Sequence, residues 1–228
     1  MFLKTYSYRY AEEILQHEKH KEAYAELMDI CRKCPVPVYE GKSKNQPKLD
    51  VVQQILNTYF LMAFTERGWE AEPIATPDSN EDALRSDFRK SFHKDSTDGP
   101  ITLQIEVEFG NVASSYRNYF KFQLSYSYDL TDICILIVPS QHLCTRIDSG
   151  VSNYEKVLRE IPSAKLSISV PILVIGLFDV DDDGVVCDSW NVKTDCFDIQ
   201  IVKGSDKKHE EAHKQLVYRY MQGLYTKK

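Results

Sequence analysis

The stretch Ile105-Glu106-Val107-Glu108-Phe109-Gly110-Asn111 has the pattern of a β-strand that ends in a tight turn. Successive side chains of a strand point to opposite faces, so Glu106 and Glu108 lie on the same face. Two carboxylates on one face can share a metal ion. An isolated Glu-x-Glu is more often the solvent-facing side of a half-buried strand. The residues around the pair therefore decide its meaning.

Length and composition predict one compact domain. The chain has 228 residues, of which 43% are hydrophobic and 27% are charged, which fits a single domain over 1–228. No charged-then-apolar leader opens the sequence, and the longest apolar runs, 133–139 and 171–178, are too short to span a bilayer. We therefore expect a cytoplasmic protein that has no membrane partner.

The formal net charge of −6 argues mildly against nucleic acid as a partner. Carboxylates that bind divalent cations lose their repulsion toward phosphate, so this objection is weak if acids cluster at a metal site. Among six cysteines, only Cys31 and Cys34 have metal-ligand spacing, and a zinc ribbon needs a second close pair. Reduced thiols are expected.

Helical periodicity dominates the first third of the chain, and strand patterns dominate the rest. The expected helices lie at 11–34, broken near 17–21, and at 49–67, 114–126, 141–147, 154–161 and 207–225. The expected strands lie at 87–91, 101–109, 132–139, 171–178, 185–190 and 197–202. Strand, helix, strand in the middle is the βαβ pattern, whose strands usually lie parallel. The fold class is therefore α/β, with a central mixed β-sheet flanked by helices.

A third acid, Asp87, lies 19 residues before Glu106 in a short predicted strand. If these strands pair antiparallel, Asp87 comes within coordinating distance of Glu106. Mg²⁺ prefers oxygen ligands and is typically held by one or two carboxylates plus substrate phosphate. Glu108 can accept a proton from a metal-bound water that attacks a phosphodiester. This set predicts Mg²⁺-dependent phosphodiester hydrolysis, with Asp87 and Glu106 as metal ligands.

An acid followed by a strand with Glu-x-Glu resembles the variant of the PD-(D/E)xK nuclease motif in which an acid replaces the lysine. The continuation Gly110-Asn111-Val112-Ala113-Ser114-Ser115-Tyr116-Arg117 resembles type II restriction endonucleases of the BamHI/BglII/BstYI group. Further similar segments follow in the same order, at 132–139, 150–155, 171–176 and 203–206, and the N-terminal 11–15 and 22–24 fit as well. The likeness therefore covers most of the chain.

The resemblance implies a restriction-endonuclease-like core and an enzyme that cuts double-stranded DNA as a homodimer, with Mg²⁺ as cofactor. Matching two-fold symmetry of protein and palindromic DNA is the physical reason for a dimer. A companion DNA methyltransferase in the host is also implied, with no direct contact expected. Carried over by resemblance, Asp87 and Glu106 bind the metal and Glu108 activates the water. A further catalytic acid lies upstream in this group; Glu72 is the nearest candidate and Glu70 the alternative.

Polar residues in the turn and helix after the acid strand are candidates for reading bases. Asn111 can bond adenine bidentately, and Arg117 can pair with guanine or with phosphate. Asn111 is also a residue type that tolerates a turn with positive φ, and Ser114 can be a helix cap as well as a base contact. The resemblance adds further candidate DNA contacts, namely Ser149, Gly150, Lys203, Ser205 and Asp206.

Two departures from the group bear on the target sequence. Ser149-Gly150 stands where an Asp-Arg pair reads the outer base pair, and it cannot present a guanidinium to guanine. The outer pair is then read loosely or differently. A GATC core is implied for the inner bases, although Ala113 replaces a serine of the group.

Two other functions compete. His209-Glu210-Glu211-Ala212-His213 matches the H-E-x-x-H zinc-protease motif, but 214–228 contains no His, Asp or Glu to supply a third ligand. A non-catalytic, sequence-specific DNA-binding protein on the nuclease fold is the more serious alternative. The intact Asp87, Glu106 and Glu108 argue against it, because a pure binder gains nothing from unpaired acids near phosphates.

Overall fold

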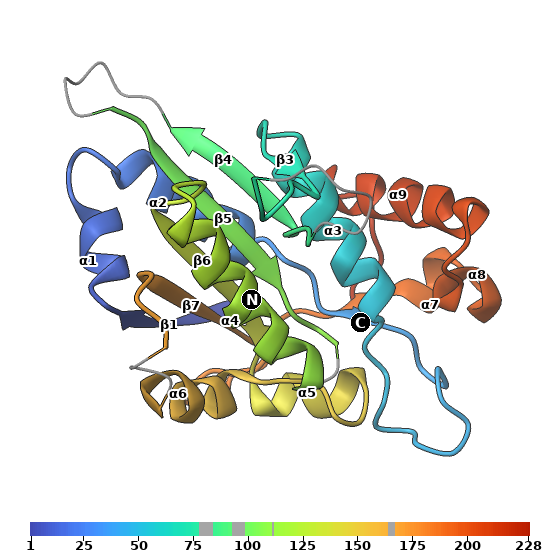
Figure 1. Ribbon diagram of the computed structural model, residues 1–228. Coiled ribbons are helices and arrows are strands. Elements are labelled where there is room, and N and C mark those ends of the chain that lie inside the picture. Colours follow the sequence, from blue (N-terminus) through green and yellow to red (C-terminus); the bar gives the residue numbers. More distant parts are fainter. Residues whose placement is uncertain (78–83, 93–98, 111, 164–166) are drawn as a thin grey trace.

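The computed structural model describes residues 1–77, 84–92, 99–110, 112–163 and 167–228. Within these residues, six strands form one sheet in the order β1-β7-β6-β5-β4-β3 (Figure 1). Their bounds are Phe2–Tyr8 for β1, Glu70–Ala71 for β3, Phe88–Phe92 for β4, Ile101–Val107 for β5, Ile133–Pro139 for β6 and Ile172–Phe178 for β7. Strands β5, β6 and β7 are parallel, and the other pairs are antiparallel. The expected mixed sheet and its βαβ unit are confirmed.

A second sheet pairs β2 (Pro37–Val38) with β8 (Trp190–Asn191) in parallel. The helices are α1 (Ala11–Gln16), α2 (Lys21–Arg32), α3 (Gln53–Thr65), α4 (Val112–Ser127), α5 (Gln141–Ile147), α6 (Tyr154–Ser163), α7 (Val192–Asp195), α8 (Ile199–Lys203) and α9 (Lys207–Met221). No described helix has the length and apolar character needed to cross a membrane.

Helices cover both faces of the main sheet, and each face has its own hydrophobic core (Figure 1). Leu103 and Ile105 of β5 join the larger core, to which α1, α2 and α3 contribute. On the other face, α4 and α6 pack over β6 and β7, with Phe122 of α4 against this smaller core. The polar face of β5 is therefore covered by α4, and Glu106 is only 2% exposed. A solvent-facing strand does not account for the two acids.

Three sequence predictions differ from the structure. Residues 199–203 form helix α8 and no strand, because the Asp198 side chain caps this helix by accepting the Gln200 N–H. The strand expected at 185–190 is reduced to β8. The edge strand β1 was not expected, since its mixed polar and aromatic residues are only half buried and give no clean alternation.

Candidate active site

The hairpin β4–β5 brings the first two candidate acids together. Phe88 lies opposite Ile105 in antiparallel register, so the next positions on the other face are Asp87 and Glu106. Asp87 Oδ2 accepts the Val107 N–H at 2.7 Å, which fixes this carboxylate against the end of β5. The antiparallel pairing expected from the sequence is present, while residues 93–98 of the connection lie outside the described residues.

Glu106 is buried beside a lysine from helix α4. Its Oε2 accepts a hydrogen bond from Lys121 Nζ. Its Oε1 is buried and has no described partner in full hydrogen-bond geometry, although the nearby Ser86 hydroxyl interacts with this carboxyl and lowers its pKa. Burial raises the pKa of Glu106 to about 8, and the neighbouring Asp87 carboxylate adds to the rise while Lys121 opposes it. Burial and the like charge of Asp87 destabilise the charged form of Glu106, and a bound cation would relieve this cost.

Asp87 lies between Glu106 and a third acid, Glu72. Burial raises the pKa of Asp87, the Val107 N–H and Lys121 act in the opposite direction, and Glu72 adds to the rise. The Glu72 N–H donates to the Asp87 carbonyl at 2.9 Å, and both residues line a pocket of about 260 Å³. Glu72 also has a φ of 53°, a left-handed conformation that costs a non-glycine residue on the order of 1 kcal/mol.

The two upstream candidates are thus separated by position. Glu70 lies on β3 opposite Arg89, and its charge raises the pKa of that guanidinium against the lowering caused by burial. Glu72 lies beside Asp87. The structure therefore brings Glu72 to the acid cluster and leaves Glu70 beside Arg89.

Glu108 follows β5 and is held through both carboxylate oxygens. Its Oε1 accepts the Gly110 N–H at 2.7 Å, and its Oε2 accepts Asn118 Nδ2 at 2.9 Å. The residue is 6% exposed. A carboxylate held in a fixed orientation in this way can act as a proton acceptor.

The donor set fits one hard divalent cation. No group of three or more His, Cys, Asp or Glu in the described ranges has a metal-binding arrangement. Mg²⁺ requires only one or two carboxylates when waters and a substrate phosphate complete its shell. Asp87 and Glu106 are such a pair, and the unpartnered Glu106 Oε1 is an oxygen free to serve as a ligand.

The candidate base-reading residues near β5 are only partly described. Asn111 lies outside the described residues, and Ser114 lies in α4 with a side chain that is also not described. Arg117 is exposed on α4. Ser149 and Gly150 lie between α5 and α6, where Gly150 has a φ of 80° that glycine adopts readily.

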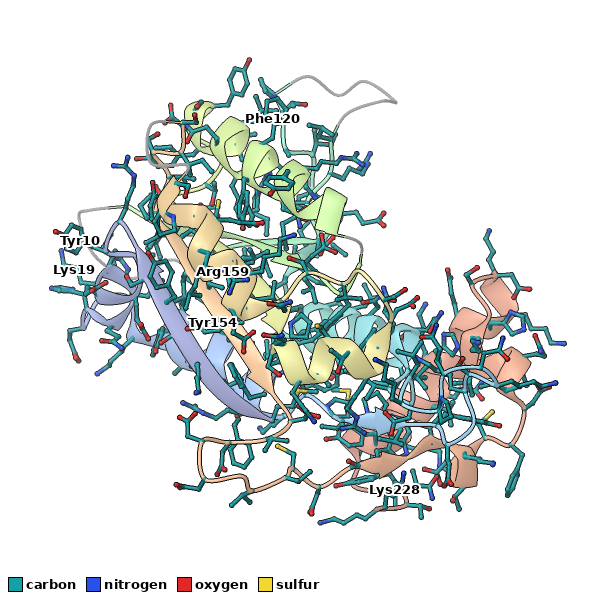
Figure 2. All side chains as sticks on the ribbon, turned by 90° about the horizontal axis from the view of Figure 1, so that it is seen from below. Tyr10, Lys19, Phe120, Tyr154, Arg159 and Lys228 are labelled. Atoms are coloured by element: carbon teal, nitrogen blue, oxygen red, sulfur yellow. The ribbon has the colours of Figure 1, made fainter. Side chains whose placement is uncertain are left out.

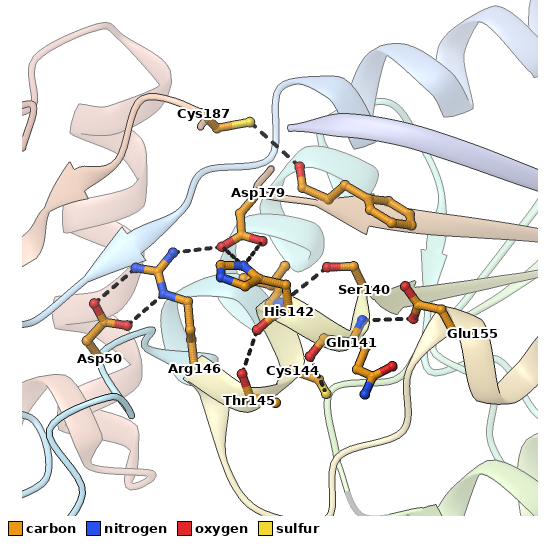
Figure 3. A network of polar contacts seen from close by, with 12 residues as sticks. Asp50, Ser140, Gln141, His142, Cys144, Thr145, Arg146, Glu155, Asp179 and Cys187 are labelled. Carbon is orange, nitrogen blue, oxygen red and sulfur yellow. Dashed lines mark hydrogen bonds and ion pairs between the residues drawn. The ribbon is translucent and has the colours of Figure 1, made fainter. Parts of the chain in front are cut away.

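The segment that carries Ser149 and Gly150 is anchored on both sides. After it, the Ser152 N–H donates to the Gly110 carbonyl at 3.2 Å, next to the acid strand. Before it, Arg146 of α5 makes a bidentate pair with Asp50 at 2.9 and 3.0 Å and contacts Asp179 at 2.7 Å (Figure 3). The segment is therefore tied to the end of β5 and to the core.

The network around Arg146 was not predicted. Figure 3 shows Asp179 between Arg146 and His142, whose Nδ1 lies 2.9 Å from Asp179 Oδ1. In the sequence, Asp179 looks like the first acid of a hairpin loop, 179–184. Its burial directly after β7 could have been suspected from its position behind an apolar strand, but its partners come from distant parts of the chain.

The C-terminal candidates have different surroundings. Ser205 lines a pocket of about 490 Å³ together with Glu72, which places it near the acid cluster. Asp206 is the N-cap of α9 and accepts the His209 N–H at 3.0 Å; this bond lowers the pKa of its carboxyl. Lys203 Nζ donates to the Lys42 carbonyl at 3.2 Å.

The two histidines of the H-E-x-x-H motif lie on α9 but have protein partners. His213 is buried, and its Nε2 lies 2.8 Å from the Ile201 carbonyl. His209 Nδ1 lies 2.8 Å from Asp206 Oδ1. The described part of the chain gives these histidines no third ligand, so the motif is an ordinary stretch of α9.

Two residues that hold the acids were missed from the sequence. Asn118 and Lys121 lie three residues apart on α4, which places them on one helix face, and both are buried. Polar residues at such spacing on the inner face of an amphipathic helix are a usable signal, but the sequence does not say which strand that face covers.

The chain is similar to known proteins in sequence and in fold. The chain matches a family model described as restriction endonuclease BglII/BglIII over residues 3–177. The crystal structure of restriction endonuclease BglII complexed with a DNA 16-mer is similar at a TM-score of 0.63 and 18% identity, covering 80% of this chain and 79% of that chain. Free BglII is similar at 0.52 and 15%, covering 80% and 81%. No curated protein matches the chain.

Proposed function

Because the chain belongs to the restriction endonuclease BglII/BglIII family, we propose that it is a type II enzyme that cuts both strands of a short palindromic DNA site as a homodimer, with Mg²⁺ as cofactor. The family consists of DNA-cleaving hydrolases that use a divalent metal ion. The observation that carries the proposal is the convergence of Asp87 and Glu106 across the β4–β5 hairpin, with Glu106 Oε1 left unpartnered.

The acids have distinct roles in this proposal. Asp87 and Glu106 would hold Mg²⁺, which supplies charge neutralisation at the phosphate and a lowered pKa for the attacking water. Glu108 accepts the proton of that water, since the Gly110 N–H and Asn118 Nδ2 hold its carboxylate in a fixed orientation after the strand that carries Glu106. Glu72, beside Asp87, is the fourth catalytic acid.

DNA recognition is assigned to residues around this cluster. Arg117 is exposed on the helix that covers the acids, and Asn111 and Ser114 precede it in the sequence. Ser149 and Gly150 lie on the anchored segment. Lys203, Ser205 and Asp206 lie where α8 ends and α9 begins, and Ser205 lines a pocket together with Glu72. The proposed core is GATC, with the outer base pair read loosely because no guanidinium occupies the Ser149-Gly150 position. A companion methyltransferase would protect host DNA.

Digestion of a sequenced plasmid tests the proposal. In Mg²⁺ the protein is expected to give discrete fragments whose ends map to one palindromic site, and EDTA is expected to stop cleavage because Asp87 and Glu106 act through the metal. Restoring Mg²⁺ in excess over EDTA should restore the same fragments. Specific DNA binding without cleavage in either Mg²⁺ or Mn²⁺ would instead support the non-catalytic DNA-binding protein.

The dimer is assigned to the outer face of α4. Tyr116 and Phe120 are 56% and 59% exposed, four residues apart on this helix, and Figure 2 shows Phe120 on its outer side. Exposed aromatics at helical spacing suit association with a second copy, and a palindrome requires two copies related by a two-fold axis.

Phe120→Asp is expected to weaken the dimer by about 2 kcal/mol, roughly 30-fold in its dissociation constant, because a charge replaces a central aromatic anchor. Sedimentation at several concentrations measures the change. Phe197→Asp, at an exposed aromatic away from α4, is the control. If Phe120→Asp and the wild type have the same dimer dissociation constant, the dimer interface does not include the outer face of α4.

A further inference from the structure

The inner face of helix α4 carries two polar side chains that reach the acids of β5. Lys121 Nζ donates to Glu106 Oε2, and Asn118 Nδ2 donates to Glu108 Oε2 at 2.9 Å. The donors are 7% and 5% exposed. One turn of one helix therefore makes direct contact with both carboxylates.

The placement of Lys121 is unusual for a lysine. Lysine is almost never buried unless it is paired, because its charge is costly to remove from water. Lys121 has Glu106 as its carboxylate partner, and its Nζ also donates to the Arg85 carbonyl at 3.2 Å. The ammonium group is directed at a candidate metal ligand and away from solvent.

These contacts decide which carboxylate oxygens remain available. Lys121 engages Glu106 Oε2, so Oε1 is the oxygen left without a hydrogen-bond partner. For Glu108, Asn118 holds one oxygen while the Gly110 N–H holds the other, which fixes the plane of the carboxylate. The orientation of each acid thus depends on a side chain from α4.

We propose that Lys121 and Asn118 are positioning residues with separate tasks, an inference that rests on the proposed function. Lys121 orients Glu106 so that Oε1 faces the metal position. Asn118 orients Glu108 toward the attacking water. Residues that fix the orientation of metal ligands typically change metal affinity or activity 10–100-fold when they are removed.

Lys121→Met keeps the volume of the side chain and removes the donor. It is expected to raise the half-saturating Mg²⁺ concentration about tenfold and to lower kcat roughly 10–100-fold, with KM for DNA unchanged. Calorimetric titration of the protein–DNA complex with Ca²⁺, in place of Mg²⁺, should show the same loss of metal affinity. Lys121→Gln, a shorter neutral donor, should fall between Lys121→Met and wild type.

Asn118→Leu separates the two tasks. It is expected to lower kcat about tenfold or more while the Mg²⁺ and Ca²⁺ affinities stay at wild-type values, because Glu108 is not a metal ligand. Lys156→Met, at a partly exposed lysine on α6, is the matched control and should change neither quantity. A merely structural role would lower the melting temperature without this division between metal affinity and kcat.

Three outcomes would overturn the inference. The first is a wild-type Mg²⁺ requirement in Lys121→Gln, and this outcome counts whether or not Lys121→Met folds. The second is a loss of metal affinity in Asn118→Leu that matches the loss in Lys121→Met. The third is a wild-type kcat in Asn118→Leu. The proposed function fails separately, if the wild-type protein itself does not cleave DNA in Mg²⁺. Cleavage by wild type together with unchanged variants would therefore reject the positioning roles alone.

Discussion

Replacement of Glu106 by alanine is expected to abolish DNA cleavage while leaving DNA binding measurable. The change removes one of the two carboxylates that face each other across the β4–β5 hairpin and leaves Lys121 buried without its carboxylate partner. Metal-assisted stabilisation of a transition state contributes several kcal/mol, so the loss should be on the order of 10³-fold or more. Asp87→Ala should have a comparable effect.

Cleavage of plasmid DNA and a gel-shift assay in Ca²⁺ measure the two properties separately. Glu211→Ala, the same substitution at an exposed position of α9, is the control and should cleave as the wild type does. Circular dichroism checks that the Glu106 variant is folded. If Glu106→Ala cleaves DNA within tenfold of the wild-type rate, Glu106 is not part of the active site.

The second large effect is on the Mg²⁺ requirement as a function of pH. Burial and the Asp87 carboxylate raise the pKa of Glu106 to about 8 in the metal-free protein, so below pH 8 a proton occupies this side chain and must leave when metal binds. Apparent affinity should then rise by up to about tenfold per pH unit, or roughly 100-fold from pH 6 to pH 8, and level off above that range.

Mg²⁺ titrations of the cleavage rate at pH 6, 7, 8 and 9 test this expectation. Burial also raises the pKa of Asp87, so any exchange of its proton for the metal has the same sign. DNA binding without metal, measured at each pH, is the control for a general effect of pH on the protein–DNA contact. If the half-saturating Mg²⁺ concentration stays constant from pH 6 to pH 8, Mg²⁺ does not displace a proton from Glu106 when it binds.

The periodicity of apolar residues was enough to predict the central strands of the sheet and their direction. The alternation around Glu106 identified the two faces of β5, and the βαβ order identified the parallel strands β5 and β6, because side-chain direction follows directly from backbone geometry. The same reasoning wrongly predicted a strand at 197–202, because the apolar β-branched residues there are typical of strands. The structure has helix α8 instead, with Asp198 as its N-cap.

The candidate site was predictable only where a linear motif carries it. Asp87, Glu106 and Glu108 follow a recognisable order, but the sequence left Glu72 and Glu70 as alternatives, and the positions of β3 and β4 separate them. Lys121 could not be assigned from the chain alone. Its partner is fixed by the packing of α4 on β5, a contact between elements that no local pattern encodes.

The anchors of the segment with Ser149 and Gly150 lie outside that segment. Arg146 is bound to Asp50 and Asp179, and Ser152 is bound to Gly110, so the two tip residues carry little of the fold's stability. This separation makes the tip a suitable place for combinatorial randomisation. Glycine or asparagine is the natural choice at Gly150, where φ is positive. If Ser149 contacts DNA as proposed, new target preferences can be selected there without any change to the acids of β5.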